Sequence, residues 1–111
     1  MEGKIPFSHF SEVEMRIGTV VSAEPVEGSE KLLKLMVDFG EDEPRQILSG
    51  IAKYTSPEAL VGTQLPFVTN LEPREMMGME SNGMLLAAHG TDGEPVFVRP
   101  ETSVEPGSKI G

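Results

Sequence analysis

The stretch Leu33-Lys34-Leu35-Met36-Val37-Asp38-Phe39 alternates between strongly apolar side chains and more polar or flexible ones. Because successive side chains of a strand point to opposite faces, this alternation predicts a strand that is buried on one face only. An acidic turn over residues 40–44 follows, and residues 45–49 then return in a second strand-like run. The two runs predict a β-hairpin, around which we arrange the rest of the chain.

Two further strands are predicted outside this hairpin. The run over residues 15–23 is rich in β-branched side chains, and Gly18 within it is typical of a bend at a barrel corner. The run over residues 64–69 contains Pro66, which favours an edge strand or a bulge because proline has no backbone N–H.

A short helix and a last pair of strands complete the prediction. Ser56 is a good N-cap, Pro57 stands at the favoured first helical position, and Gly62 suits a left-handed stop. Residues 84–88 form a continuous apolar run, and residues 96–98 are expected to pair back after a turn.

Five or six short strands, with one short helix between the third and the fourth, match the order of an OB-fold. The predicted fold class is therefore all-β, a five-stranded Greek-key barrel with terminal extensions at residues 1–12 and 100–111. A small SH3-like barrel or an open sandwich is the alternative, and the position of the helix favours the OB-fold over it.

The composition is that of one small domain spanning residues 1–111. A chain of 111 residues with 38% hydrophobic content can bury one modest core. The absence of cysteine excludes disulfides and cysteine-based zinc sites, and it fits a reducing compartment. No apolar run approaches membrane-spanning length, so we expect a soluble, cytoplasmic protein without a membrane partner.

The net charge of −9 argues against a general nucleic-acid binder, whose phosphate contacts require clustered positive charge. A local basic patch remains open if several cations converge, drawn from Lys31, Lys34, Arg45, Lys53 and Arg74. The hairpin can place Lys31 and Lys34 near Arg45 on its wet face. The alternative is a solvated hairpin with ordinary surface charges.

The segment over residues 70–84 reads Asn-Leu-Glu-Pro-Arg-Glu-Met-Met-Gly-Met-Glu-Ser-Asn-Gly-Met. Pro73 stiffens the backbone before Arg74, so this arginine is predicted to stand on a rigid arm outside the barrel strands. We interpret the segment as a functional connection, with a plain structural connection as the alternative.

Both termini carry apolar residues outside the predicted strands. Phe7, Phe10 and Val13 are predicted to plug one end of the core, with Ser8 capping one helical turn. In the tail, Val104 and Ile110 also need a surface. That surface is either an end of the same barrel or a second copy of the chain.

No catalytic or metal-binding pattern occurs in the sequence. It contains no G-x-G-x-x-G, no phosphate loop and no His-Glu-x-x-His. His9 and His89 are the only histidines, and no third group is marked that would orient His9 beside Ser8. We expect a non-catalytic protein that uses no metal and no cofactor.

Several spaced motifs together resemble one known family. They are Val26-Glu27-Gly28-Ser29-Glu30-Lys31-Leu32-Leu33-Lys34-Leu35, Ser49-Gly50-Ile51, Asn70-Leu71-x-Pro73-Arg74-x-Met76 and Ser81-x-Gly83-Met84. In this order they are similar to the tRNA-binding domain found at the C-terminus of methionyl-tRNA synthetases and in stand-alone proteins of the same fold. The similarity runs from Phe7 to about Gly107.

The resemblance implies a module that recognises the general shape of tRNA, usually as a homodimer, and that supports a synthetase catalytic domain. It implies hydrogen-bonding groups at Ser49, Asn70 and Ser81, phosphate contacts at Lys31 and Arg74, and an apolar contact at Met84. With the cations of the hairpin, the candidate tRNA-binding residues are Lys31, Lys34, Arg45, Ser49, Asn70, Arg74, Ser81 and Met84.

A non-catalytic protein-interaction or dimerisation module that does not bind RNA is the alternative function. This alternative includes a second branch of the family that resembles a secretion-related chaperone. That branch lacks the pattern over residues 29–34 and the Ser49-Gly50-Ile51 motif, so we rank it below the tRNA-binding function.

Overall fold

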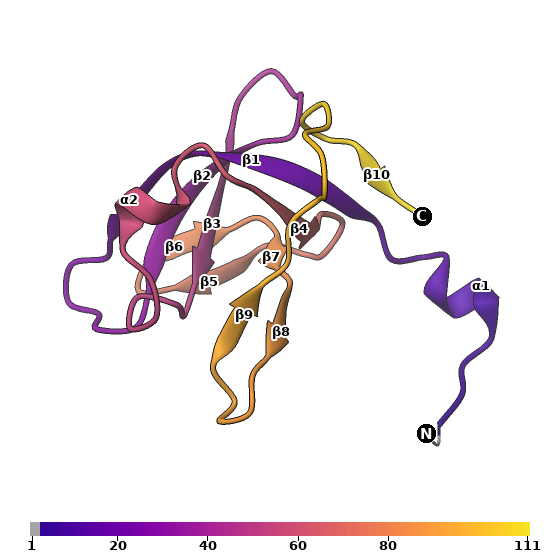
Figure 1. The fold of residues 1–111 in the computed structure, drawn as a ribbon, viewed down its shortest axis with the longest axis horizontal. Coiled ribbons are helices and arrows are strands. Elements are labelled where there is room, and N and C mark those ends of the chain that lie inside the picture. Colours follow the sequence, from indigo (N-terminus) through magenta and orange to yellow (C-terminus); the bar gives the residue numbers. More distant parts are fainter. Residues whose placement is uncertain (1–2) are drawn as a thin grey trace.

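The computed structural model describes residues 3–111, in which a six-stranded antiparallel sheet curls around one core (Figure 1). Its strand order is β3-β2-β1-β4-β7, and β10 pairs with β1 off this path. The strands are β1 (Met15–Pro25), β2 (Leu33–Asp38), β3 (Arg45–Ser49), β4 (Gln64–Val68), β7 (Met84–Leu85) and β10 (Lys109–Ile110). Because β3 also lies against β7, the sheet is a nearly closed five-stranded barrel, which confirms the all-β prediction.

The inner face of β2 forms the centre of the core. Leu33, Leu35, Val37 and Phe39 are all buried, whereas the intervening residues are half-buried. Phe39 meets Phe67 of β4 edge-to-face, with ring centroids 5.4 Å apart. The alternation in the sequence therefore predicted this strand, its faces and its hairpin partner β3 correctly.

Gly18 in β1 and Pro66 in β4 are present for reasons other than the predicted bend and edge strand. A Cβ at Gly18 would overlap the side chains of Val37 and Phe39, so Gly18 allows close packing, and the irregularity of β1 lies between Val20 and Ser22 instead. Pro66 is not on an edge strand, because β4 lies between β1 and β7. It is not at a bulge towards β1 either, because the register between β1 and β4 is continuous.

The hydrogen-bond pattern explains how a proline fits at this inner position. Its partner in the register is Ile17, whose backbone groups bond to Gly107 and Ser108 and thus require no N–H from Pro66. On its other side Pro66 only accepts a bond, from the N–H of Leu86.

The short helix forms as predicted, as α2 (Pro57–Leu60). The Ser56 hydroxyl accepts a hydrogen bond from the N–H of Ala59 at 3.3 Å, which satisfies one free amide of the first turn. Gly62 follows the helix with a φ of +85°, the left-handed conformation expected there.

The segment over residues 70–84 is not an irregular connection but contains a β-hairpin, β5 (Arg74–Met76) and β6 (Met79–Ser81). This hairpin packs on β3, where the side-chain amide of Gln46 donates to the carbonyl of Glu80. The predicted strand over residues 84–88 is also divided: β7 ends at Leu85, and β8 (Ala87–His89) pairs with β9 (Pro95–Phe97) in a separate hairpin.

The prediction that the N-terminal extension plugs one end of the core is wrong for residues 3–13. Residues 1 and 2 lie outside the described range. Helix α1 (Phe7–Phe10) stands clear of the barrel in Figure 1, and 78% of Phe7 is exposed. Phe10 and Val13 are exposed as well, so none of the three plugs the core. The N-cap is Pro6, and Ser8 lies inside the helix.

Candidate functional site

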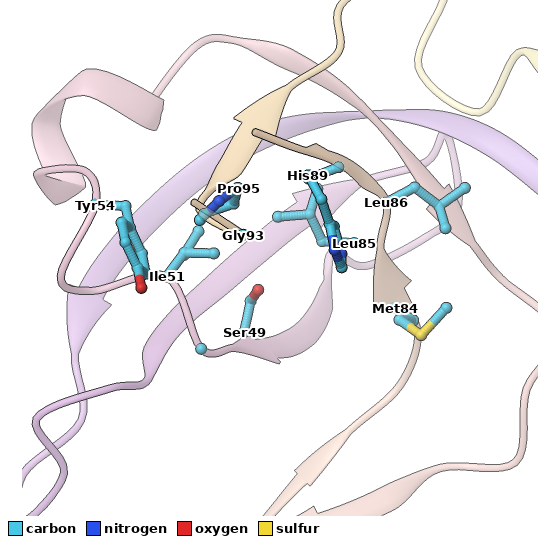
Figure 2. A pocket seen from close by; sticks show the side chains of 11 residues that line it. Ser49, Ile51, Tyr54, Met84, Leu85, Leu86, His89, Gly93 and Pro95 are labelled. Carbon is cyan, nitrogen blue, oxygen red and sulfur yellow. The ribbon is translucent and has the colours of Figure 1, made fainter. Parts of the chain in front are cut away.

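Two neighbouring hollows on the barrel surface share Met84 in their lining. The first, of about 480 Å³, lies beside β7 and is bordered by Ser49, Ile51, Tyr54, Met84, His89 and Pro95 (Figure 2). The second, of about 90 Å³, lies under the β5–β6 hairpin and is bordered by Leu48, Glu72, Arg74, Met76, Ser81 and Met84. We call these the Tyr54 hollow and the Arg74 hollow, and the two together the Met84 face.

Local backbone geometry builds the Tyr54 hollow. Ser49 ends β3, and the chain then makes a turn in which the N–H of Tyr54 donates to the carbonyl of Ile51. The N–H of Ala52 donates to the carbonyl of Lys31, which fixes this turn to the segment before β2. Opposite the turn stands the β8–β9 hairpin, which brings His89 and Pro95 into the wall.

The Arg74 hollow depends on a tight hairpin turn. Met77 and Gly78 both have positive φ, at +52° and +76°, as a two-residue type I′ turn requires. The register of the hairpin pairs Arg74 with Ser81. Ser81 is buried, where its hydroxyl accepts from the N–H of Leu48 at 3.0 Å and donates to the carbonyl of Gly83 at 3.3 Å.

The structure brings four of the predicted site residues into the Met84 face: Ser49, Arg74, Ser81 and Met84. Lys31 lines neither hollow, but its carbonyl is bonded to Ala52 in the turn that borders the Tyr54 hollow, and its side chain is exposed. Within residues 3–111, neither Lys31 nor Arg74 forms an ion pair. Their charges are therefore available to a ligand.

Lys34 and Asn70 lie elsewhere and have partners within the chain. The Lys34 ammonium pairs with Glu24 at 2.6 Å, in a hollow bordered by Met77 and Met79. The Asn70 side chain accepts from the N–H of Glu14 at 2.8 Å and donates to the carbonyl of Glu12 at 2.7 Å. Asn70 thus fastens the N-terminal segment to the barrel.

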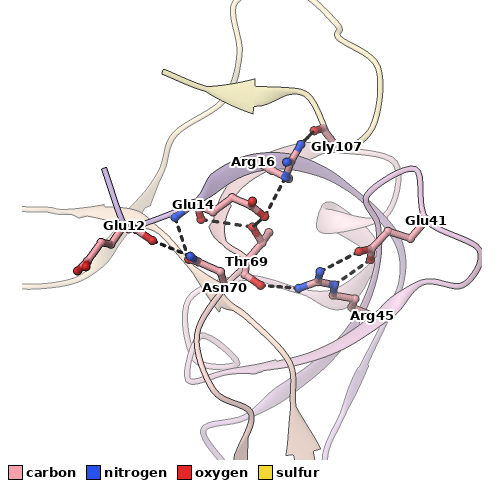
Figure 3. A network of polar contacts seen from close by, with 8 residues as sticks. All are labelled: Glu12, Glu14, Arg16, Glu41, Arg45, Thr69, Asn70 and Gly107. Atoms are coloured by element: carbon pink, nitrogen blue, oxygen red, sulfur yellow. Dashed lines mark hydrogen bonds and ion pairs between the residues drawn. The ribbon is translucent and has the colours of Figure 1, made fainter. Parts of the chain in front are cut away.

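Arg45 belongs to a polar network at the other end of β3 (Figure 3). Its guanidinium donates twice to Glu41, at 2.8 Å each, and once to the carbonyl of Thr69 at 2.7 Å. It also lies over the ring of Phe39, 5.4 Å from the centroid. The register pairs Arg45 with buried Val37, so the Arg45 side chain does not lie on the wet face of the hairpin near Lys34. The prediction that these two cations share that face is wrong.

The same network continues through Glu14, Thr69 and Arg16. Hydrogen bonds from Arg16 and from the Thr69 hydroxyl lower the pKa of Glu14 to about 2. The hydrogen bonds from Arg45 likewise lower the pKa of Glu41. Arg16 also donates to the carbonyl of Gly107 at 2.8 Å, which ties the C-terminal segment to β1. The network joins segments that are distant in the sequence.

Sequence reasoning missed Tyr54 and His89. Tyr54, the only tyrosine of the chain, is 56% exposed. An aromatic residue beside Lys53 and three residues after the Ser49-Gly50-Ile51 motif is the sequence signal that could have identified it. The position of His89 depends on the break after β7, which the sequence does not indicate.

Residues 3–111 offer neither a metal site nor a membrane-spanning helix. No group of three or more His, Asp or Glu side chains there is placed to hold a metal ion. No helix in the same range is long and apolar enough to cross a membrane.

Comparison with known proteins places this geometry in a family. The sequence model of a family described as "Putative tRNA binding domain" matches residues 15–109. The chain is 46% identical to a methionine–tRNA ligase of Methanococcoides burtonii and 50% identical to one of Methanothrix thermoacetophila, each over 96% of its length. It spans only 16% and 15% of the length of these two ligases.

Solved structures of similar size match over nearly their whole length. A protein related to methionyl-tRNA synthetase from Pyrococcus horikoshii superposes with a TM-score of 0.92 at 36% identity, covering 99% of this chain and 100% of the other. The chaperone CsaA of Bacillus anthracis superposes with a TM-score of 0.87 at 31% identity, covering 98% and 100%. On this sequence and structural similarity, the chain belongs to the tRNA-binding domain family.

Proposed function

We propose that the domain binds tRNA through the Met84 face and recognises the general shape of the molecule. The observation that carries the proposal is the meeting of Ser49, Arg74, Ser81 and Met84 in two adjoining hollows, although they come from three separate motifs. Folded RNA offers phosphates, 2′-hydroxyls and unstacked bases, which match the cation of Arg74, the Ser49 hydroxyl and the apolar side chain of Met84, whereas the buried Ser81 hydroxyl shapes the site through its bonds to Leu48 and Gly83.

The distribution of charge supports this use of a chain with a net charge of −9. No Asp or Glu borders the Tyr54 hollow, whereas Glu41, Glu43 and Glu80 border the hollow near Arg45. The unpaired cations Lys31 and Arg74 lie at or beside the Met84 face. Glu72 borders the Arg74 hollow, so it is the Tyr54 hollow that offers RNA a lining without carboxylates.

The domain is proposed to serve a methionyl-tRNA synthetase in the cytoplasm, either as a part of the same chain or as a separate protein. A tRNA-binding module tethered to a catalytic domain raises the local concentration of the substrate without taking part in the chemistry. The identity to methionine–tRNA ligases supports this assignment.

A homodimer is part of the proposal. Ile5, Phe7 and Phe10 are exposed on the N-terminal segment, and Val104 is exposed on the C-terminal one. An isologous interface of about 1,600 Å² would cover such residues. Light scattering over a dilution series tests it: we expect the dimer mass down to low micromolar concentration, and a monomer throughout would contradict it.

Filter binding of a tRNA transcript across a salt series tests the proposed function. Because few cations flank the Met84 face, we expect weak binding and a log-log slope of about 2 to 3, at roughly 0.7 to 0.9 per phosphate contact. An absence of any complex at low salt, or equal binding of an unstructured single strand, would contradict recognition of tRNA shape.

A further inference from the structure

We infer that the Tyr54 hollow receives one unpaired nucleotide of the bound RNA, whose base packs against the rings of Tyr54 and His89. This inference rests on the proposed function and adds a specific subsite to it. Figure 2 shows Tyr54 and His89 on opposite sides of Ser49, with the serine hydroxyl directed into the space between them.

The dimensions and the lining of the hollow fit such an occupant. Its volume of about 480 Å³ falls within the range of small-ligand pockets, about 300 to 1,000 Å³. Both residues are exposed and both line the hollow, so a base can reach their rings without disturbing the core. Unstacked bases of RNA loops pack on tyrosine and histidine rings in the same way.

Polar and charged groups are arranged for a nucleotide rather than for an apolar side chain alone. The half-buried Ser49 hydroxyl can donate to or accept from the edge of any base. No carboxylate borders the hollow, and Lys31 and Lys53 lie in the two segments joined beside Tyr54, where they can meet the flanking phosphates.

The β8–β9 hairpin, which carries His89, keeps its shape through hydrogen bonds within its own turn. The N–H of Gly90 donates to the carbonyl of Glu94 at 2.7 Å, and the N–H of Gly93 donates to the carbonyl of Gly90 at 3.0 Å. The Glu94 carboxylate accepts from the N–H of Asp92 and is thereby engaged at the tip of the hairpin. These bonds fix the shape of the hairpin tip before any ligand binds, which lowers the entropic cost of ordering this wall on binding.

Affinity measurements on full-length variants test the subsite. We expect Tyr54→Ala and His89→Ala each to weaken binding of a tRNA transcript at least about fivefold, the lower limit for loss of a base–aromatic contact. Tyr54→Phe keeps the ring and should bind as the wild type does. Val96→Ala is the matched control, because Val96 is exposed on the same hairpin but lies outside the hollow.

Aromatic NMR resonances give a readout that does not depend on affinity. The chain has one tyrosine and two histidines, so each ring can be followed separately. A short single-stranded oligoribonucleotide should shift the Tyr54 and His89 ring protons upfield and leave His9 unchanged. The same oligonucleotide with abasic sugars should shift neither ring.

The possible results separate the subsite from the proposed function. If wild-type protein binds tRNA and both alanine variants bind it equally well, the subsite is wrong and tRNA binding stands. Equal ring shifts with the abasic strand would also overturn it, as would ring shifts with an apolar peptide and none with RNA. If the wild-type protein binds no tRNA, the proposed function and the subsite fail together.

Discussion

Arginine has opposite roles in two regions of this domain. In the polar network, Arg45 is only 19% exposed at its side chain, and all three of its guanidinium nitrogens donate, to Glu41 and to the carbonyl of Thr69. On the Met84 face, Arg74 is exposed and has no ion pair within residues 3–111. A basic residue in a motif is therefore a binding candidate only when the fold leaves its donors unused.

The largest expected effect concerns the stability of the network. Arg45→Ala removes three charge-assisted hydrogen bonds and the contact with the Phe39 ring, so the free energy of unfolding should fall by about 1.5 to 3 kcal/mol, with the pair to half-exposed Glu41 adding little. Urea denaturation measures this. Arg74→Ala is the matched control and should change stability by less than about 0.5 kcal/mol. Equal losses in the two variants would remove the contrast.

The second prediction concerns tRNA binding, in which Arg74 is expected to matter. Arg74→Ala should weaken tRNA binding by about 1 to 3 kcal/mol, the scale of a charge-assisted hydrogen bond to phosphate. Its thermal transition should stay that of the wild type, because Arg74 is exposed and forms no ion pair within residues 3–111. If the variant loses its thermal transition, Arg74 is structural and the assignment of the Met84 face is wrong.

A third prediction follows from the lowered pKa of Glu14, which titrates at about 2 in the folded protein against an ordinary value of 4.5. The stabilisation by its ionised carboxylate is complete above about pH 4.5 and disappears as the pH falls through 2. Glu14→Gln should cost no more than about 1 kcal/mol at neutral pH, because the pair is partly exposed. Urea midpoints of both proteins at several pH values measure the difference, and a difference constant down to pH 2 would contradict the assignment.

The smallest expected effect concerns the contribution of Lys31 to the salt dependence of tRNA binding. Lys31→Ala should lower the salt slope of tRNA binding by about 0.7 to 0.9, the contribution of one phosphate contact. Lys109→Ala is the control, since Lys109 is exposed in β10, beside Arg16 and the network. A slope that falls equally in both variants would show that RNA senses only the overall charge.

Patterns that act locally were enough to predict most of the barrel. The alternation over residues 33–39 and the capping at Ser56 each depend on neighbours in the chain, and both are present in the structure. Pro66 and Gly18 could not be interpreted in this way. Their roles depend on the bonds of Ile17 and on the side chains of Val37 and Phe39, which come from other strands.

The candidate site shows the same division. Motif resemblance named Ser49, Arg74, Ser81 and Met84, and the fold brings them together. The resemblance could not reveal that the Asn70 side chain is used within the chain, because its partner Glu12 is distant in the sequence. Arg45, proposed as a cation of the hairpin, is held by distant Thr69 and also by Glu41, which is close enough in the sequence to have indicated a partner. Whether the residues named here bind tRNA stays a prediction for the variants above.

The pairing of Met15 with Ile110 has a consequence for protein engineering. Paired strands lie about 5 Å apart, so the first and last strands of the barrel can be joined by a short loop. A circular permutant closed there, without residues 1–14, and opened at the exposed Asp42 keeps every strand of the barrel and should fold, but with lower stability, because it loses the contacts of Glu14 and places Glu41 at a chain end. The new ends would lie beside Arg45 and outside the lining of both hollows of the Met84 face, so a fluorescent protein fused there leaves the proposed RNA-binding residues uncovered for a binding assay.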